Sequence, residues 1–182
     1  MSKNDIDHMF LVTGGPGSGK TTLINALAAC GFVCMPEAGR TIIQQQVAIE
    51  GAALPWSDRL AFAELMLELD IRSYQAAQKV NGSVIFDRGI PDVLGYLQLI
   101  GIPAPPHIGE AARAYRYHRR VFIAPPWPEI FGQDAERKQS LAEAEATYDA
   151  MVAVYSQLGH ELLRLPLAPV AERVAFVRKI VG

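Results

Sequence analysis

The chain has 182 residues, of which 50% are hydrophobic, and this is enough to bury the core of one compact domain. Its 17 basic and 19 acidic residues give a formal net charge of -2, which removes any charge-based reason to expect nucleic acid or a membrane surface as a partner. We therefore expect a single domain over residues 1–182 that acts on small soluble molecules, and nothing in the sequence indicates its oligomeric state.

Short apolar runs alternate with helical patterns along the chain. The apolar runs predict strands at 9–13, 32–35, 83–86, 121–124 and 161–165. Apolar residues at helical spacing predict helices at 19–30, from 39 onward, between 57 and 80, at 91–100, 106–119 and 138–158, and from 169 to the end. This alternation is typical of a parallel sheet covered on both faces. We predict an α/β fold, a three-layer α/β/α sandwich with a five-stranded parallel sheet.

The sequence shows no sign of secretion or of a membrane span. Residues 1–8 are polar, and glycines and prolines interrupt the longest uncharged stretch, 93–109. The two cysteines, Cys30 and Cys34, have no nearby partners that would complete a zinc site, so we expect reduced thiols. We expect a cytoplasmic location.

A complete phosphate-binding motif lies between the first predicted strand and the first predicted helix. Residues 14–21 match the pattern GxxxxGK[ST] in full. Glycines let backbone amides surround a polyphosphate, the helix N-terminus adds a favourable dipole, and Lys20 supplies a full positive charge. We expect Thr21 to offer its hydroxyl to Mg²⁺. The predicted nucleotide-binding residues are Gly14, Gly15, Pro16, Gly17, Ser18, Gly19, Lys20, Thr21 and Thr22.

A carboxylate ends the third predicted strand. Asp87 follows an apolar run, and ligands bind at the C-terminal ends of strands in open parallel sheets. We therefore expect Asp87 to face Thr21 across the metal ion. The alternative is that Asp87 only caps the turn that follows. Arg88 stands where many motor-type ATPases place a glutamate, which disfavours dedicated ATP hydrolysis.

A second carboxylate follows the second predicted strand. Glu37 stands beside the expected phosphate site, where it can accept a hydrogen bond from a hydroxyl and align that hydroxyl with the γ-phosphorus. The alternative is that Glu37 occupies the first turn of a helix and pairs with Arg40.

The segment 125–140 follows the fourth predicted strand and contains Trp127, Arg137 and Lys138. We expect a lid that brings Arg137 or Lys138 to the phosphates. A solvated helix start with Asp134 as its N-cap explains the segment equally well. A further basic cluster is expected at the cationic end of a helix and comprises Arg113, Arg116, Arg119 and Arg120.

These motifs together resemble the P-loop kinases of nucleosides and nucleotides. The chain looks most similar to small ATPase-like proteins related to the nicotinamide riboside kinase domain of bacterial NAD-regulator proteins. The resemblance implies that ATP binds residues 14–22, that Glu37 faces the acceptor, and that Asp87 with Arg88 forms the acid-arginine pair after the third strand. It places Arg137 in the lid. The proline-rich stretch 124–128 departs from the arginine-dense lids of many nucleotide kinases.

The sequence thus predicts a magnesium-dependent phosphotransferase that uses ATP and acts on a small hydroxyl-bearing molecule, such as a nucleoside or riboside. The catalytic residues expected are Lys20, Glu37, Asp87, Arg88 and Arg137, and the metal-binding residues are Thr21 and Asp87. The alternative is a nucleotide-binding regulatory or sensor module with slow ATPase activity. No guanine-reading Asn/Thr-Lys-x-Asp motif is present, which favours ATP over GTP.

Overall fold

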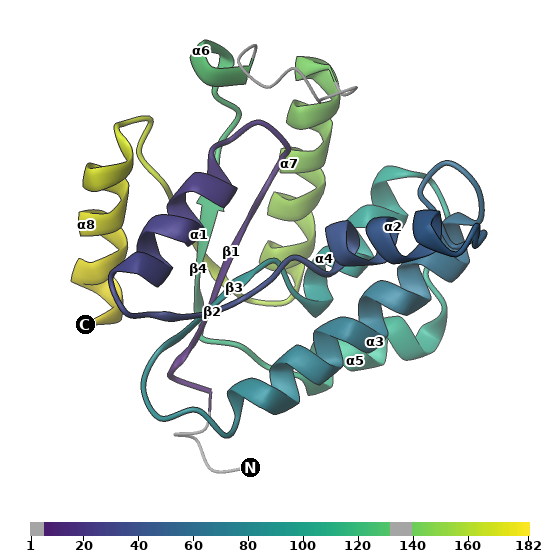
Figure 1. Ribbon diagram of the computed structural model, residues 1–182, viewed down its shortest axis with the longest axis horizontal. Helices are drawn as coiled ribbons and strands as arrows, with labels where there is room; N and C mark the ends of the chain where they lie inside the picture. Colours follow the sequence, from purple (N-terminus) through teal and green to yellow (C-terminus); the bar gives the residue numbers. More distant parts are fainter. Residues whose placement is uncertain (1–5, 132–139) are drawn as a thin grey trace.

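The computed structural model describes residues 6–131 and 140–182, and its strands form one parallel sheet (Figure 1). The strands are β1 (Met9–Gly14), β2 (Val33–Met35), β3 (Val84–Asp87), β4 (Arg120–Ala124) and β5 (Glu161–Arg164). They lie in the order β2-β3-β1-β4-β5, and each neighbouring pair is parallel. This confirms the predicted five-stranded parallel sheet.

Helices cover both faces of the sheet, which confirms the three-layer sandwich. The helices are α1 (Lys20–Ala29), α2 (Ala38–Ala48), α3 (Arg59–Ala77), α4 (Ile90–Leu99), α5 (Pro106–Ala114), α6 (Pro128–Phe131), α7 (Leu141–Gln157) and α8 (Val170–Val181). In Figure 1, α1 and α8 lie on one side of β1, and α7 lies on the other. Among the described residues, no helix has both the length and the apolar character to cross a bilayer.

The alternation of side chains along β1 divides the core in two. Phe10 and Val12 pack with Leu23 and Leu27 of α1 on one face of the sheet. Buried residues of α8 belong to the same cluster. Met9 and Leu11 belong to the larger core on the opposite face, together with buried residues of α3, α4, α5 and α7. Successive residues of a strand point to opposite faces, so a strand buried on both faces reads as a continuous apolar run.

The helix predicted at 106–119 is shorter than expected. It ends at Ala114, so Arg116 and Arg119 lie in the connection to β4 and only Arg113 is in its last turn. The prediction that the four arginines end one helix is therefore wrong. Tyr117 is buried, and the Tyr74 hydroxyl donates to the Arg116 carbonyl oxygen at 2.8 Å, so tertiary contacts replace helical ones here.

The end of α2 also differs from the helical pattern in the sequence. Ile42 is buried as expected, but Val47 is 56% exposed and Ile49 is 71% exposed. Ile49 is the C-cap residue of α2, and Glu50 follows with a left-handed φ of 54°. The apolar stripe therefore reaches the solvent where the chain turns toward α3.

The C-terminal ends of the parallel strands place the candidate site. The P-loop follows β1, Glu37 follows β2, and Arg88 follows β3. Register pairs Val12 with Asp87. Residues far apart in the sequence thus meet at one edge of the sheet.

Candidate functional site

The phosphate-binding loop depends on glycine where the chain turns most sharply. Gly14 has a φ of 129°, and a Cβ there would lie 2.3 Å from the carbonyl oxygen of Ala124 on β4. Gly19 has a φ of 73°, and a Cβ there would lie 2.6 Å from Nη1 of Arg173. Only glycine fits both positions without distortion, because other residues rarely adopt these angles and the neighbouring atoms leave no room for a side chain.

The N-terminus of α1 is open to an anion. Gly19 is the N-cap residue and offers no side-chain cap, so the first N–H groups of α1 lack the partner that a capping side chain supplies. Such a helix N-terminus attracts phosphate groups through its N–H donors and its dipole. Pro16 is half-buried, Gly17 is buried with a left-handed φ of 74°, and Thr21 and Thr22 are exposed in the first turn.

Lys20 folds back onto the loop that precedes it. Its Nζ donates to the Gly15 carbonyl oxygen at 2.6 Å and lies 3.4 Å from Ser18 Oγ, and Ser18 Oγ donates to the same carbonyl at 2.8 Å. Burial, followed by the positive charge of Arg88, lowers the pKa of Lys20 to about 7. The carboxylates of Asp87 and Glu37 oppose this shift. A bound polyphosphate would add negative charge and favour the protonated amine.

Arg173 of α8 braces the P-loop from outside the motif. Its side chain is buried, and Nη1 donates to the carbonyl oxygens of Ser18 at 3.0 Å and Gly19 at 3.3 Å. The guanidinium carbon also lies 5.6 Å from the ring centroid of Trp127, near enough for a cation–π contact. Arg173 is not predictable from the sequence, because nothing in the local pattern of α8 relates it to residues 18 and 19.

Asp87 ends β3 with one oxygen unused. Its side chain is buried, and Oδ1 has no hydrogen-bond partner among the described residues. Burial, and secondly the negative charge of Glu37, raise the pKa of Asp87 above its usual value. The interpretation of Asp87 as a cap is not supported, because Asp92 fills that role for α4. A buried oxygen acceptor without a donor fits a hard cation such as Mg²⁺ or its bound water.

Glu37 and Arg88 form an ion pair between the ends of β2 and β3. Arg88 Nε donates to Glu37 Oε1 at 3.1 Å, and both side chains are mostly buried. Burial alone would raise the pKa of Glu37, but the charges of Arg88 and Lys20 outweigh it and the pKa lies below its usual value. Glu37 is the N-cap residue of α2 but its side chain makes no capping hydrogen bond. Glu37 forms its ion pair with Arg88, whereas Arg40 makes only a smaller contribution to lowering the pKa of Glu37.

A third carboxylate, Asp92, joins the site through hydrogen bonds. It lies in the first turn of α4, is buried, and accepts from Arg88 Nη1 at 3.1 Å. Asp70 of α3 is a further buried carboxyl, and burial with the negative charge of Asp92 raises its pKa well above the usual value. Asp92 has one weak signal in the sequence. It is an acidic residue at the third position of α4, which begins at Ile90 after the N-cap residue Gly89.

The predicted residues outside the lid are thus brought together at one edge of the sheet. The charges of four side chains of the site contribute to the pKa of Lys20, namely Arg88, Asp87, Glu37 and Asp92. Arg137 and most of the expected lid lie in residues 132–139, outside the part of the chain that the structure describes. Within the described ranges, no group of three or more histidine, cysteine or acidic side chains is arranged to hold a metal ion by itself.

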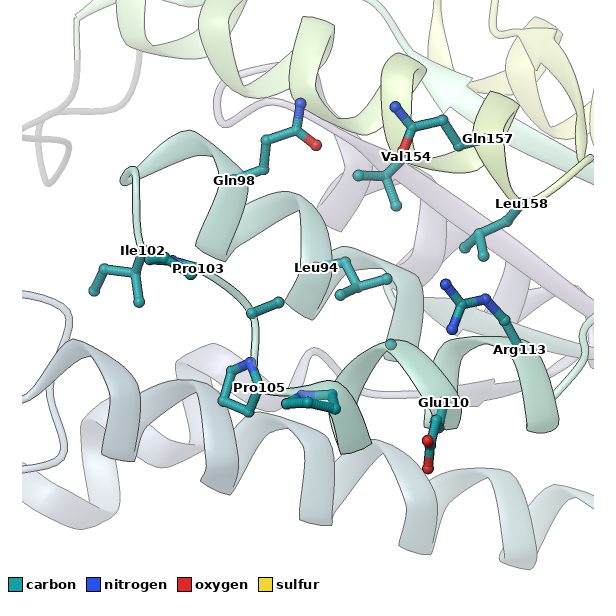
Figure 2. A pocket seen from close by; sticks show the side chains of 13 residues that line it. Leu94, Gln98, Ile102, Pro103, Pro105, Glu110, Arg113, Val154, Gln157 and Leu158 are labelled. Carbon is teal, nitrogen blue, oxygen red and sulfur yellow. The ribbon is translucent and has the colours of Figure 1, made fainter.

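A cavity lies elsewhere on the molecule, away from the P-loop. Figure 2 shows this space of about 610 Å³ between α4, α5 and α7, with Leu94, Gln98, Arg113 and Gln157 among its lining residues. None of the predicted site residues lines it. The candidate site is therefore defined by the P-loop and the surrounding charges and not by cavity size.

A family model described as an AAA domain matches residues 9–173. The chain belongs to this AAA domain family. The match includes the P-loop, Glu37, Asp87 and Arg88 and extends to Arg173. No curated protein matches the sequence at a significant level.

Solved structures of kinases share the fold over most of the chain. Thymidylate kinase from Ehrlichia chaffeensis matches with a TM-score of 0.65 and 16% identity, over 96% of this chain and 98% of that one. NadR protein in complex with NR matches with a TM-score of 0.71 and 16% identity, over 97% of this chain but 52% of that one, so this chain spans about half of NadR. Deoxyadenosine kinase from M. mycoides matches with a TM-score of 0.59 and 11% identity, over 94% and 97%. The predicted resemblance to P-loop kinase-like proteins is confirmed at the level of family and fold.

Proposed function

We propose that the chain is a magnesium-dependent phosphotransferase that binds ATP at residues 14–22 and phosphorylates a hydroxyl group of a small molecule of the nucleoside or riboside type. The observation that carries the proposal is the ion pair between Glu37 and Arg88, which adjoins Lys20 and the unpartnered oxygen of Asp87. Related folds in thymidylate kinase, deoxyadenosine kinase and NadR support the same class of reaction.

The phosphate side of the site supports triphosphate binding. The open N-terminus of α1 and the buried Lys20 provide donors and positive charge for the β- and γ-phosphates. Thr21, which is exposed at the start of α1, and the buried Oδ1 of Asp87 would hold Mg²⁺. The ion would neutralise phosphate charge and polarise the γ-phosphoryl group.

The acceptor side supports transfer to a hydroxyl group in preference to water. The acceptor oxygen forms a bond to the γ-phosphorus while the bond to the β–γ bridging oxygen breaks, and ADP leaves. The hydroxyl proton passes to Glu37 or to solvent. Because the transition state is loose, the main tasks of Glu37 and Arg88 are to align the acceptor and to stabilise charge on the transferred group. Arg88 also occupies the position of the glutamate that would polarise water in many motor-type ATPases.

The segment 125–140 is proposed as a lid of the same domain. Trp127 at its start contacts Arg173, and Arg173 donates a hydrogen bond to the Ser18 carbonyl oxygen of the P-loop. A movement of this segment would therefore shift the P-loop. Arg137 is the residue of the segment that we propose to approach the phosphates.

A regulatory or sensor module with slow ATPase activity is the second candidate. In this alternative the ion pair between Glu37 and Arg88 is a structural contact, and Glu37 takes no part in turnover. Such a protein would bind nucleotide through the P-loop and show no acceptor-dependent turnover.

A screen of nucleosides, ribosides and nucleotides for acceptor-dependent ADP release with magnesium-ATP separates these functions. The kinase proposal predicts that at least one hydroxyl-bearing compound of the nucleoside or riboside type stimulates ADP release well above the rate with ATP alone. Equal, slow release with every compound would favour the sensor module, provided that calorimetry shows that nucleotide is bound.

A further inference from the structure

We propose that Asp92 is a positioning residue that sets the geometry of Arg88 for phosphoryl transfer, a role that rests on the proposed kinase function. Asp92 is buried in the first turn of α4 and accepts hydrogen bonds from four groups. These are Thr13 Oγ1 at 2.5 Å, Arg88 Nη1 at 3.1 Å, the Gly89 backbone N–H at 3.1 Å and the Tyr155 hydroxyl at 2.5 Å.

The two carboxylate oxygens of Asp92 have different partners. Oδ2 accepts from the Gly89 N–H and the Tyr155 hydroxyl, which caps α4 and ties it to α7. Oδ1 accepts from Thr13, the residue before the P-loop, and from Arg88. A residue needed only as a helix cap would require the first set alone. The Oδ1 contacts link the start of the phosphate loop to the arginine at the acceptor side.

Arg88 has an uncommon backbone conformation, which supports a functional role for its contact with Asp92. Its φ is 70°, in the left-handed region that non-glycine residues rarely adopt. Its backbone N–H donates to the Val12 carbonyl oxygen at 3.0 Å, which fixes the chain to β1. Such conformations persist where the surroundings determine them, and they concentrate at functional sites.

The Arg88 guanidinium is held between carboxylates of two different elements. Nε donates to Glu37 at the start of α2, and Nη1 donates to Asp92 of α4. These two contacts use one N–H on each of the two nitrogens, and a guanidinium has five N–H donors in a fixed plane. Because the guanidinium is planar, Glu37 and Asp92 together fix the direction of its remaining N–H donors. The positive charge of Arg88 also contributes to the lowered pKa of Lys20, so the guanidinium acts on the amine of the P-loop.

A double-mutant cycle between Asp92 and Arg88 tests this role. We expect Asp92→Asn to lower acceptor-dependent kcat by about 10²-fold, since a displacement of roughly 1 Å has effects of that size. The affinity for magnesium-ADP should change little. In the Arg88→Gln background, Asp92→Asn should lower kcat by less than about threefold further, because residues that act through one another are not additive.

Tyr155→Phe is the matched control, because it removes a donor to Oδ2 and leaves the Oδ1 contacts in place. It should lower the melting temperature and leave kcat much closer to the wild-type value than Asp92→Asn does. Equal losses of kcat in the two variants, or a full additional loss from Asp92→Asn in the Arg88→Gln background, would show that Asp92 serves only the fold.

A titration with magnesium-ADP and aluminium fluoride separates failure of this proposal from failure of the kinase function. The complex mimics the transferred phosphoryl group and needs no acceptor. Asp92→Asn should weaken its binding but not the binding of ADP alone, again without further effect in the Arg88→Gln background. If wild type binds the complex in this way but no acceptor stimulates ADP release, the kinase function fails and the role of Asp92 stands. If the complex binds no tighter than ADP, or Asp92→Asn does not weaken it, the role of Asp92 is refuted.

Discussion

The phosphate loop and the acceptor side of the site are built in different ways. The loop is contiguous in sequence, and its shape comes from glycine backbone angles and from the N-terminus of α1. The acceptor side is assembled from side chains at the ends of β2 and β3 and in α4, joined by the hydrogen bonds of Arg88. In the proposed function the loop binds phosphate, whereas the cluster around Arg88 aligns the acceptor. Changes in the two regions should therefore have separable effects.

The largest separable effect is expected at Glu37. Glu37→Gln keeps the size of the side chain but removes the charge that aligns an acceptor hydroxyl and balances Arg88. We expect acceptor-dependent turnover to fall by about 10²–10⁴-fold while nucleotide affinity barely changes. Steady-state ADP release and nucleotide titration on one preparation measure both. Glu68→Gln, which alters an exposed ion pair with Arg72, is the control and should leave both unchanged. Unchanged turnover in Glu37→Gln would remove Glu37 from the acceptor side.

Lys20→Ala tests the other region and should affect nucleotide binding directly. At a ligand concentration of about 100 times Kd, binding stabilises a protein by about 2.7 kcal/mol, a melting shift of roughly 5–10 °C for a chain of this size. Magnesium-ATP should produce this shift in wild type, and Lys20→Ala should lose most of it. Lys179→Ala, at the exposed end of α8, should keep it. A shift retained in Lys20→Ala would contradict the predicted role of the P-loop lysine.

The pH dependence of nucleotide binding should follow the titration of Lys20. Its pKa is about 7 in the free protein, and bound phosphates raise it by favouring the protonated amine. Affinity for magnesium-ADP is then fully present below pH about 7 and falls, by up to about tenfold per pH unit, as pH rises toward the pKa of the bound state. Calorimetry in buffers of different ionisation enthalpy should show proton uptake on binding. Lys20→Arg stays charged and should flatten the profile. A flat wild-type profile up to pH about 9 would contradict this account.

The smallest effect expected is on stability at Asp87. Its pKa is raised in the folded protein, so the free energy of unfolding falls as pH rises through that pKa and the penalty is complete above it. At neutral pH, Asp87→Asn should therefore stabilise the nucleotide-free protein by about 1 kcal/mol and weaken the magnesium-dependent part of nucleotide binding. Urea unfolding and titration with and without Mg²⁺ measure these effects. Asp149→Asn, exposed on α7, should do neither. Destabilisation by Asp87→Asn would show that the carboxylate serves the fold.

The same contrast explains what the sequence predicts well. The P-loop is predictable because its residues are adjacent and each does its work locally, from the glycine angles to Lys20. The sheet is predictable because its central strands β1, β3 and β4 are nearly continuous apolar runs that are buried on both faces. The positions of Asp87 and Glu37 at strand ends predict their place in the site, and both carboxylates act on the pKa of Lys20.

The partners of these residues were not predictable, because they depend on tertiary packing. The bond between Asp92 and Tyr155 joins residues 63 positions apart, and the bond between Arg173 and the Ser18 carbonyl spans 155 positions. The early end of α5 has a similar cause, since burial of Tyr117 outweighs the helical pattern that continues toward Arg119. The periodicity and spacing of residues in the sequence do not predict such contacts.

The central claim is most directly tested by detecting the phosphorylated acceptor itself. Wild type is incubated with magnesium-ATP and each hydroxyl-bearing compound that stimulates ADP release, and the products are separated and analysed by mass spectrometry. The account predicts a product that carries one added phosphoryl group, formed in proportion to ADP by wild type and nearly absent with Glu37→Gln. ADP formation that is matched by free phosphate, with no modified acceptor, would contradict it.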